Sequence, residues 1–107
     1  MTDVLLDQLK KCLDQYGIES QIRDDRAEGM YISIGDNRWR RKRAQFWVNH
    51  KTGAVNFWIG VDMGKIYSLA SYSKYRVEYK TEKYGEIHLV FPYLYPAMEF
   101  IRMIGEV

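Results

Sequence analysis

The sequence has very little cysteine: Cys12 is the one cysteine among its 107 residues. A single thiol cannot form a disulfide within the chain, so the sequence excludes a small secreted scaffold held together by disulfides. Such low cysteine use is typical of a reducing compartment, and we expect a cytoplasmic location. Because Cys12 falls on the apolar side of a predicted helix, we expect a buried small hydrophobic residue rather than a reactive thiol.

Long apolar runs are also missing, and none approaches the roughly 20 residues that span a bilayer. The first residues, MTDVLLDQLKKCLDQYG, lack the basic start, apolar run and small-residue cleavage site of a secretory signal. Hydrophobic residues make up 47% and charged residues 28% of the chain, which excludes a disordered or low-complexity polypeptide. We therefore expect one globular domain over residues 1–107, with no membrane partner.

Groups suited to catalysis or metal binding are scarce. The two histidines, His50 and His88, belong to no cluster of cysteine, histidine and carboxylate with metal-ligand spacing. The sequence contains no nucleophile elbow, phosphate-binding glycine loop or dinucleotide fingerprint. Arginines flank the adjacent carboxylates Asp24 and Asp25, which is typical of a solvated turn. The sequence therefore predicts a non-enzymatic protein with no catalytic residue, no cofactor and no metal.

Two segments have the apolar period of an amphipathic helix. In residues 3–16 we expect Thr2 or Asp3 to cap the start and Gly17 to end the helix in the left-handed conformation. The second helix is expected to begin at Pro96, whose missing amide proton costs nothing in a first turn, and to end at Gly105. The apolar positions recur every three or four residues in both segments: Leu5, Leu6, Leu9, Cys12, Leu13 and Tyr16, then Ala97, Phe100, Ile101 and Ile104.

Between these helices, apolar and polar residues alternate, which is the period of a β-strand. The pattern predicts three hairpins in residues 18–34, 44–61 and 75–91, whereas segment 62–74 has no clear period and fits a short strand or a turn of helix equally well. In the third hairpin, His88 is expected to point away from the core and to be solvated or bonded at a sheet edge. The predicted fold class is α+β: a single domain with a curved antiparallel sheet of about six strands, a meander of hairpins, packed on one face by N- and C-terminal helices.

The second hairpin has the strongest alternation. Phe46 and Val48 alternate with Trp47 on its first strand, and Phe57 alternates with Trp58 on its second. If the phenylalanines face the core, both tryptophans lie on the opposite face, because successive side chains of a strand point to opposite sides. We expect Tyr31 to lie on this same face.

Positive charge is concentrated in residues 38–43, named here the basic segment: Arg38, Trp39, Arg40, Arg41, Lys42 and Arg43. These positions hold five of the sixteen basic residues, and without them the net charge of +2 would become −3. Lysine and arginine neutralise phosphates, and tryptophan stacks on unpaired bases. The basic segment together with Trp47 and Trp58 therefore predicts binding of nucleic acid, with single strands favoured.

Other interpretations of the same residues remain open. The basic segment also fits a solvated loop between two strands, or a contact with an acidic protein. The chain would then be a protein interaction module that uses the aromatic face, such as an inhibitor, immunity factor, chaperone or assembly subunit. A homodimer formed through the same face is one form of this alternative. The nine tyrosines would suit such an interface. A further reading is a small-ligand pocket between sheet and helices, lined by Tyr16, Tyr93 or Tyr95.

Overall fold

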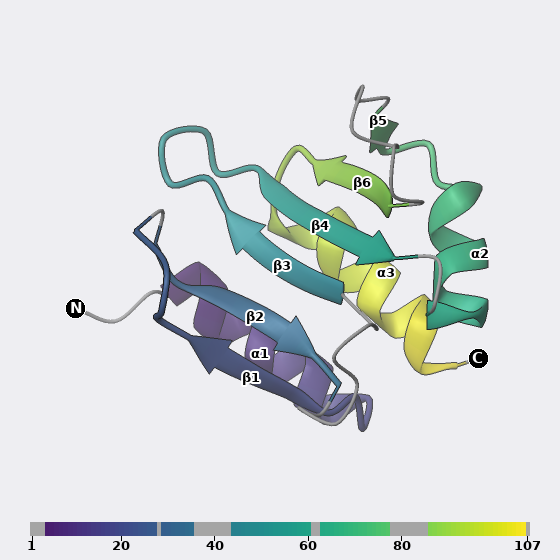
Figure 1. Cartoon of the computed structure of the whole chain (residues 1–107), viewed down its shortest axis with the longest axis horizontal. Helices are drawn as coiled ribbons and strands as arrows, with labels where there is room; N and C mark the ends of the chain where they lie inside the picture. The colour runs from purple at the N-terminus through teal and green to yellow at the C-terminus, as the bar shows by residue number, and fades with distance from the viewer. Residues whose placement is uncertain (1–3, 28, 36–43, 61–62, 78–85, 107) are drawn as a thin grey trace.

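The computed structural model describes residues 4–27, 29–35, 44–60, 63–77 and 86–106. In the described chain, six strands form one antiparallel sheet in the order β1-β2-β3-β4-β6-β5. Helices at both ends of the chain pack on this sheet (Figure 1), which confirms the predicted α+β class. The elements are α1 (Val4–Gln15), β1 (Ser20–Arg23), β2 (Tyr31–Ile34), β3 (Ala44–Val48), β4 (Val55–Gly60), α2 (Lys65–Ser71), β5 (Arg76–Val77), β6 (Glu86–Phe91) and α3 (Leu94–Gly105).

The two terminal helices lie behind the same face of the sheet in the view of Figure 1. The core fills the space between them and this face, and its centre is aromatic. Phe57 on β4 lies opposite Phe46 on β3, with ring centroids 4.4 Å apart, and packs on Phe100 of α3 at 5.3 Å. All three rings are buried. The phenylalanine face of the second hairpin is therefore the core face, as the alternation predicts.

The first helix ends as the sequence predicts. Gly17 has a φ of 69°, and the amide of Ile18 reaches back to the carbonyl of Leu13 at 2.9 Å. This pairing closes the last turn and satisfies carbonyls that have no partner within the helix. Cys12 is buried in the core, and burial, with a smaller effect of Glu99, raises the pKa of its thiol. The expected capping residues Thr2 and Asp3 lie outside the described residues.

The last helix differs from its prediction at both ends. It begins at Leu94, with Pro96 as its third residue, because the first turn has no intrahelical acceptor for its amides and a proline there removes no bond. Gly105 remains within the helix rather than ending it in a left-handed conformation. Its missing side chain instead makes room for Tyr16, the residue that follows α1, since a Cβ at this position would lie 2.7 Å from the Cβ of Tyr16.

The third hairpin joins the sheet through its second strand. β6 pairs with β4 along six residues, and the short strand β5 lies outside it at the edge. The segment from β4 to β5 contains α2, so the previously undecided residues 62–74 include a helix. The connection from β4 to β5 is long enough to cross over the position of β6, so β5 pairs with the outer edge of β6.

Among the described residues, every helix is too short or too polar to cross a membrane.

Candidate nucleic-acid interface

The sheet face turned away from α1 and α3, named here the open face, carries the predicted tryptophans. The antiparallel register places Ser33, Gln45, Trp58 and His88 opposite one another on β2, β3, β4 and β6. Trp47 lies two residues beyond Gln45, opposite Asn56. Both indoles are half-buried. The structure thus brings Trp47 and Trp58 to one face, opposite the core, as predicted.

A stacked pair of rings fixes Trp58 on this face. Its indole lies on the imidazole of His88, with ring centroids 3.7 Å apart and an angle of 6° between the planes. His88 Nε2 and the Oδ1 atom of Asn56 are 2.8 Å apart, within hydrogen-bond distance. The imidazole is therefore held from one side by an amide and covered by the indole.

His88 departs from its predicted environment. It points away from the core, as the alternation indicates, but it is buried rather than solvated, with 5% of its surface exposed. Burial disfavours the charged imidazolium and lowers the pKa of His88 from 6.5 to about 4. The alternation of apolar and polar residues could not show this, because the cover comes from Trp58 on a neighbouring strand.

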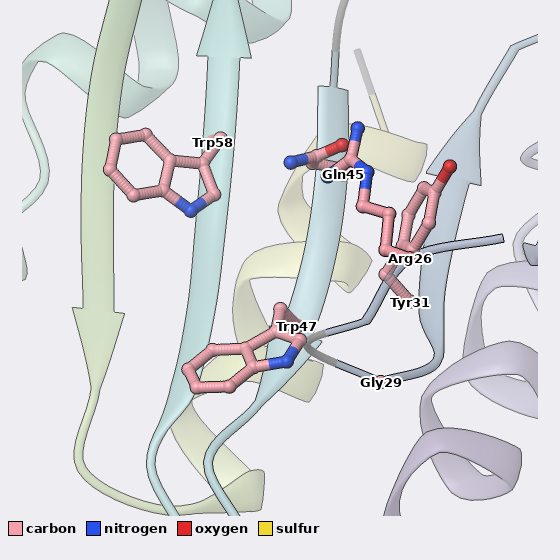
Figure 2. Close-up of a pocket in the computed structure, with 6 residues that line it drawn as sticks. All are labelled: Arg26, Gly29, Tyr31, Gln45, Trp47 and Trp58. Carbon is pink, nitrogen blue, oxygen red and sulfur yellow. The ribbon is translucent and has the colours of Figure 1, made fainter. Parts of the chain in front are cut away.

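A cavity of about 410 Å³ opens between the two tryptophans and the β1–β2 connection, and we call it the tryptophan cavity (Figure 2). This volume lies within the range of small-molecule sites in proteins. Its walls are aromatic on three sides, with one amide and one guanidinium among them. The lining residues are Arg26, Gly29, Tyr31, Gln45, Trp47 and Trp58.

Tyr31 and its neighbours form one wall of the tryptophan cavity. The Tyr31 hydroxyl donates a hydrogen bond of 2.7 Å to Asp25, and the guanidinium of Arg26 lies 4.2 Å from the centroid of the Tyr31 ring. Burial and then the bond to Asp25 raise the pKa of Tyr31. Asp25, one of the two adjacent carboxylates, thus orients the tyrosine that supports Arg26.

The basic segment lies outside the described residues, so Arg38, Trp39, Arg40, Arg41, Lys42 and Arg43 have no described geometry. The positions on either side of this gap are described. β2 ends at Ile34, which follows Ser33, and β3 begins at Ala44, which precedes Gln45. Ser33 and Gln45 lie opposite each other in the sheet. The chain therefore leaves and re-enters the sheet beside the tryptophan cavity.

A second cavity, of about 480 Å³, lies between α2, the connection from α2 to β5, and α3, and we call it the tyrosine groove. It contains Tyr93 and Tyr95 of the predicted ligand pocket, but Tyr16 is not among its lining residues and packs against Gly105. Tyr72 is 90% exposed, Tyr95 is 63% and Tyr93 is 58%. The lining residues are Leu69, Tyr72, Ser73, Lys74, Tyr75, Phe91, Tyr93, Tyr95, Pro96, Glu99, Phe100 and Met103.

Four residues at the open face or its adjoining turn were not among the predicted site residues: Arg26, Gln45, Asn56 and His88. Gln45 and Asn56 belong to the same alternation as the tryptophans, so the strand period alone could have placed them there. Arg26 precedes β2 in a turn, and its position over Tyr31 depends on the path of that turn. In the described ranges, no group of three or more histidine, cysteine or carboxylate side chains is arranged to hold a metal ion.

Comparison with known proteins gives no family for this chain: no family model, no curated protein and no solved structure matches it.

Proposed function

We propose that this protein is a non-enzymatic, cytoplasmic binding protein that holds single-stranded nucleic acid on the open face. The observation that carries the proposal is the arrangement of two half-buried tryptophans on one sheet face around a common cavity. A half-buried indole can stack on an unpaired base, and each such stack contributes about 1–3 kcal/mol to binding. The tryptophan cavity provides the space in which a base would lie.

The electrostatic part of the proposal depends on the basic segment. Within the described open face and its adjoining turn, Arg23 and Arg26 are balanced by Asp24 and Asp25. We assign the positive charge that holds a phosphate backbone to residues 38–43, because they contain five basic side chains and directly precede β3, which carries Gln45. Stacking would act on the bases and the basic segment on the phosphates.

Single strands suit this arrangement better than a duplex. The faces of paired bases are covered by their neighbours in a duplex, whereas a single strand can turn its bases onto aromatic side chains. The proposal therefore predicts that single-stranded DNA or RNA binds more tightly than a duplex of the same sequence.

The test is a titration of the full chain with short labelled single-stranded and duplex DNA and RNA. Binding is monitored by tryptophan fluorescence and by the anisotropy of the label. The titration is repeated at about 50 and 200 mM salt, because phosphate contacts weaken steeply with salt. Quenching of tryptophan by single strands, with affinity that falls strongly at the higher salt, would support the proposal. Absence of binding at the lower salt would reject it.

The tyrosine groove favours a second candidate function, that of a protein interaction module. Aromatic residues are enriched at protein interfaces, and the groove gathers four of the most exposed large apolar side chains of the described chain: Tyr72, Tyr93, Tyr95 and Met103. Self-association is the simplest form of this candidate. Sedimentation without any ligand would reveal it as a mass that rises with protein concentration, and substitution of Tyr72 and Tyr95 by serine should abolish that rise.

A further inference from the structure

We infer that Arg26 holds the phosphate of the nucleotide whose base lies in the tryptophan cavity. The inference rests on the proposed function and deepens it, because it adds one phosphate contact at the cavity wall to those of the basic segment. It starts from the place of Arg26, which lines the cavity together with Tyr31 and both tryptophans (Figure 2).

The guanidinium of Arg26 is held at the cavity although the residue is exposed. It lies 4.2 Å from the centroid of the Tyr31 ring, within the range of cation–π attraction. Tyr31 is itself only 6% exposed, and its hydroxyl is bonded to Asp25 at 2.7 Å, so the ring that supports the guanidinium is fixed. An arginine held in this way loses less conformational freedom on binding an anion than a mobile surface side chain would.

The hydrogen-bond donors of Arg26 are available to a ligand. The Tyr31 ring attracts the cation through its π electrons, and the five N–H donors of a guanidinium lie in a planar fork. Among the described residues, no carboxylate forms an ion pair with this guanidinium, and the nearby Asp25 carboxylate accepts a bond from the Tyr31 hydroxyl. Asp24 and Asp25 thus offset the net charge of the turn without occupying the donors of Arg26.

This combination of groups fits a nucleotide. The guanidinium fork matches two oxygens of one phosphate, and the indoles of Trp47 and Trp58 offer surfaces on which a base can stack. A single sugar joins the base and the phosphate of a nucleotide, so both groups can reach the walls of one cavity. The volume of about 410 Å³ is near the lower end for small-molecule sites, which suits one nucleotide rather than several. A nucleoside, which has no phosphate, would use only the aromatic part of the cavity.

The first experiment compares thymidine with thymidine 5′-monophosphate as competitors of labelled oligo(dT), about eight nucleotides long, bound to the full chain. Competition is followed by the anisotropy of the label at one fixed ionic strength. In the wild type the monophosphate should compete about tenfold better than the nucleoside, as expected for charge-assisted hydrogen bonds to one phosphate. Arg26→Gln should remove most of this advantage. The readout is the ratio of the two competitors within each protein, so a general change in the shape of the cavity affects both terms.

Arg23→Gln is the matched control, because it removes the same charge three residues away. The Arg23 guanidinium does not line the cavity, and it donates hydrogen bonds of 3.0 Å from Nε to Ser33 and of 3.1 Å from Nη2 to Gln21. This variant should keep the advantage of the monophosphate. Circular dichroism should show that both variants are folded.

The second experiment measures the affinity of each protein for labelled oligo(dT) as a function of salt. In Arg26→Gln the slope of its logarithm against the logarithm of salt should shrink by about 0.7, the contribution of one phosphate contact of a single strand. In Arg23→Gln the slope should stay at the wild-type value. This arm shows whether Arg26 contacts a phosphate within a strand as well as that of a free nucleotide.

Three results would overturn the inference while the proposed function stands. They are equal competition by thymidine and its monophosphate in the wild type, an advantage of the monophosphate that persists in Arg26→Gln, and a loss of that advantage that is as large in Arg23→Gln. Failure of labelled oligo(dT) itself to bind would reject both the inference and the proposed function.

Discussion

The indole of Trp58 and the imidazole of His88 lie in nearly parallel planes, 6° apart, with their centroids separated by 3.7 Å. The two residues face each other on β4 and β6, so the stack spans two central strands on the open face. It covers His88 and holds the indole against the sheet, beside the tryptophan cavity. A ring held in this way loses less conformational freedom when a ligand stacks on it than a mobile side chain would.

The burial of His88 predicts that stability falls in mild acid. Its pKa in the folded protein is about 4, below the ordinary value of 6.5, so the unfolded chain binds more protons below about pH 6.5. The contribution of neutral His88 to the free energy of unfolding should therefore be fully present above that pH. This contribution should be lost as the pH falls toward about 4. Between pH 7 and pH 5 the loss should be about 2 kcal/mol, measured by urea unfolding.

His88→Phe is the control for this titration. Phenylalanine can still stack on Trp58 but binds no proton, so the loss between pH 7 and pH 5 should be smaller in the variant by about 2 kcal/mol. The comparison uses the change with pH rather than absolute stability, since the variant also leaves Asn56 without its partner. Equal pH dependence in the two proteins would show that His88 is protonated as readily when folded as when unfolded.

Charge reversal in the basic segment should weaken nucleic-acid binding without unfolding the protein. For Arg40→Glu with Arg41→Glu, we expect stability within about 0.5 kcal/mol of the wild type, as is usual for surface positions. Affinity for single strands should fall, and the slope of its logarithm against the logarithm of salt should shrink by about 1.4, since each phosphate contact contributes about 0.7.

The matched control is Lys11→Glu with Lys65→Glu, which makes the same change in net charge at two exposed positions on α1 and α2. It should leave the salt slope unchanged. If the control weakens binding as much as the first variant, the binding depends on net charge and not on the basic segment. If Arg40→Glu with Arg41→Glu unfolds the protein, the expectation that this segment lies at the surface is wrong.

Phe57→Ala should destabilise the domain by about 3–5 kcal/mol, because it leaves a cavity where the sheet meets α3. Phe57 is fully buried between Phe46 and Phe100. Thermal or urea unfolding measures the effect. Tyr72→Ala, at a residue 90% exposed, should change stability by less than about 0.5 kcal/mol, and a comparable loss in the two variants would contradict the assigned core.

Gly105→Ala tests how closely α3 approaches Tyr16, because the sign of the stability change depends on this distance. In an unobstructed helix the substitution would stabilise by about 1 kcal/mol, because alanine is the better helix former. Here the new Cβ would lie 2.7 Å from the Cβ of Tyr16, so α1 and α3 would have to separate. We expect a net destabilisation of about 1–3 kcal/mol in urea unfolding. A gain in stability would show that the two helices do not meet as closely as this distance indicates.

The sequence by itself determined the features that depend on near neighbours along the chain. The end of α1 at Gly17 follows from one residue that tolerates a positive φ. The division of the second hairpin into a phenylalanine face and a tryptophan face follows from the strand period, which needs only the identity of successive residues. The α+β class and the pairing of each hairpin follow from the same periods.

Only the tertiary structure decided what depends on residues far apart in sequence. The insertion of β6 between β4 and β5, the cover of Trp58 over His88 and the space that Gly105 leaves for Tyr16 each join distant segments. The same holds for the tryptophan cavity, which combines the β1–β2 turn with β3 and β4. Local periodicity states which way a side chain points, but the neighbour that it meets is set by sheet order and helix packing, which no short stretch of sequence contains.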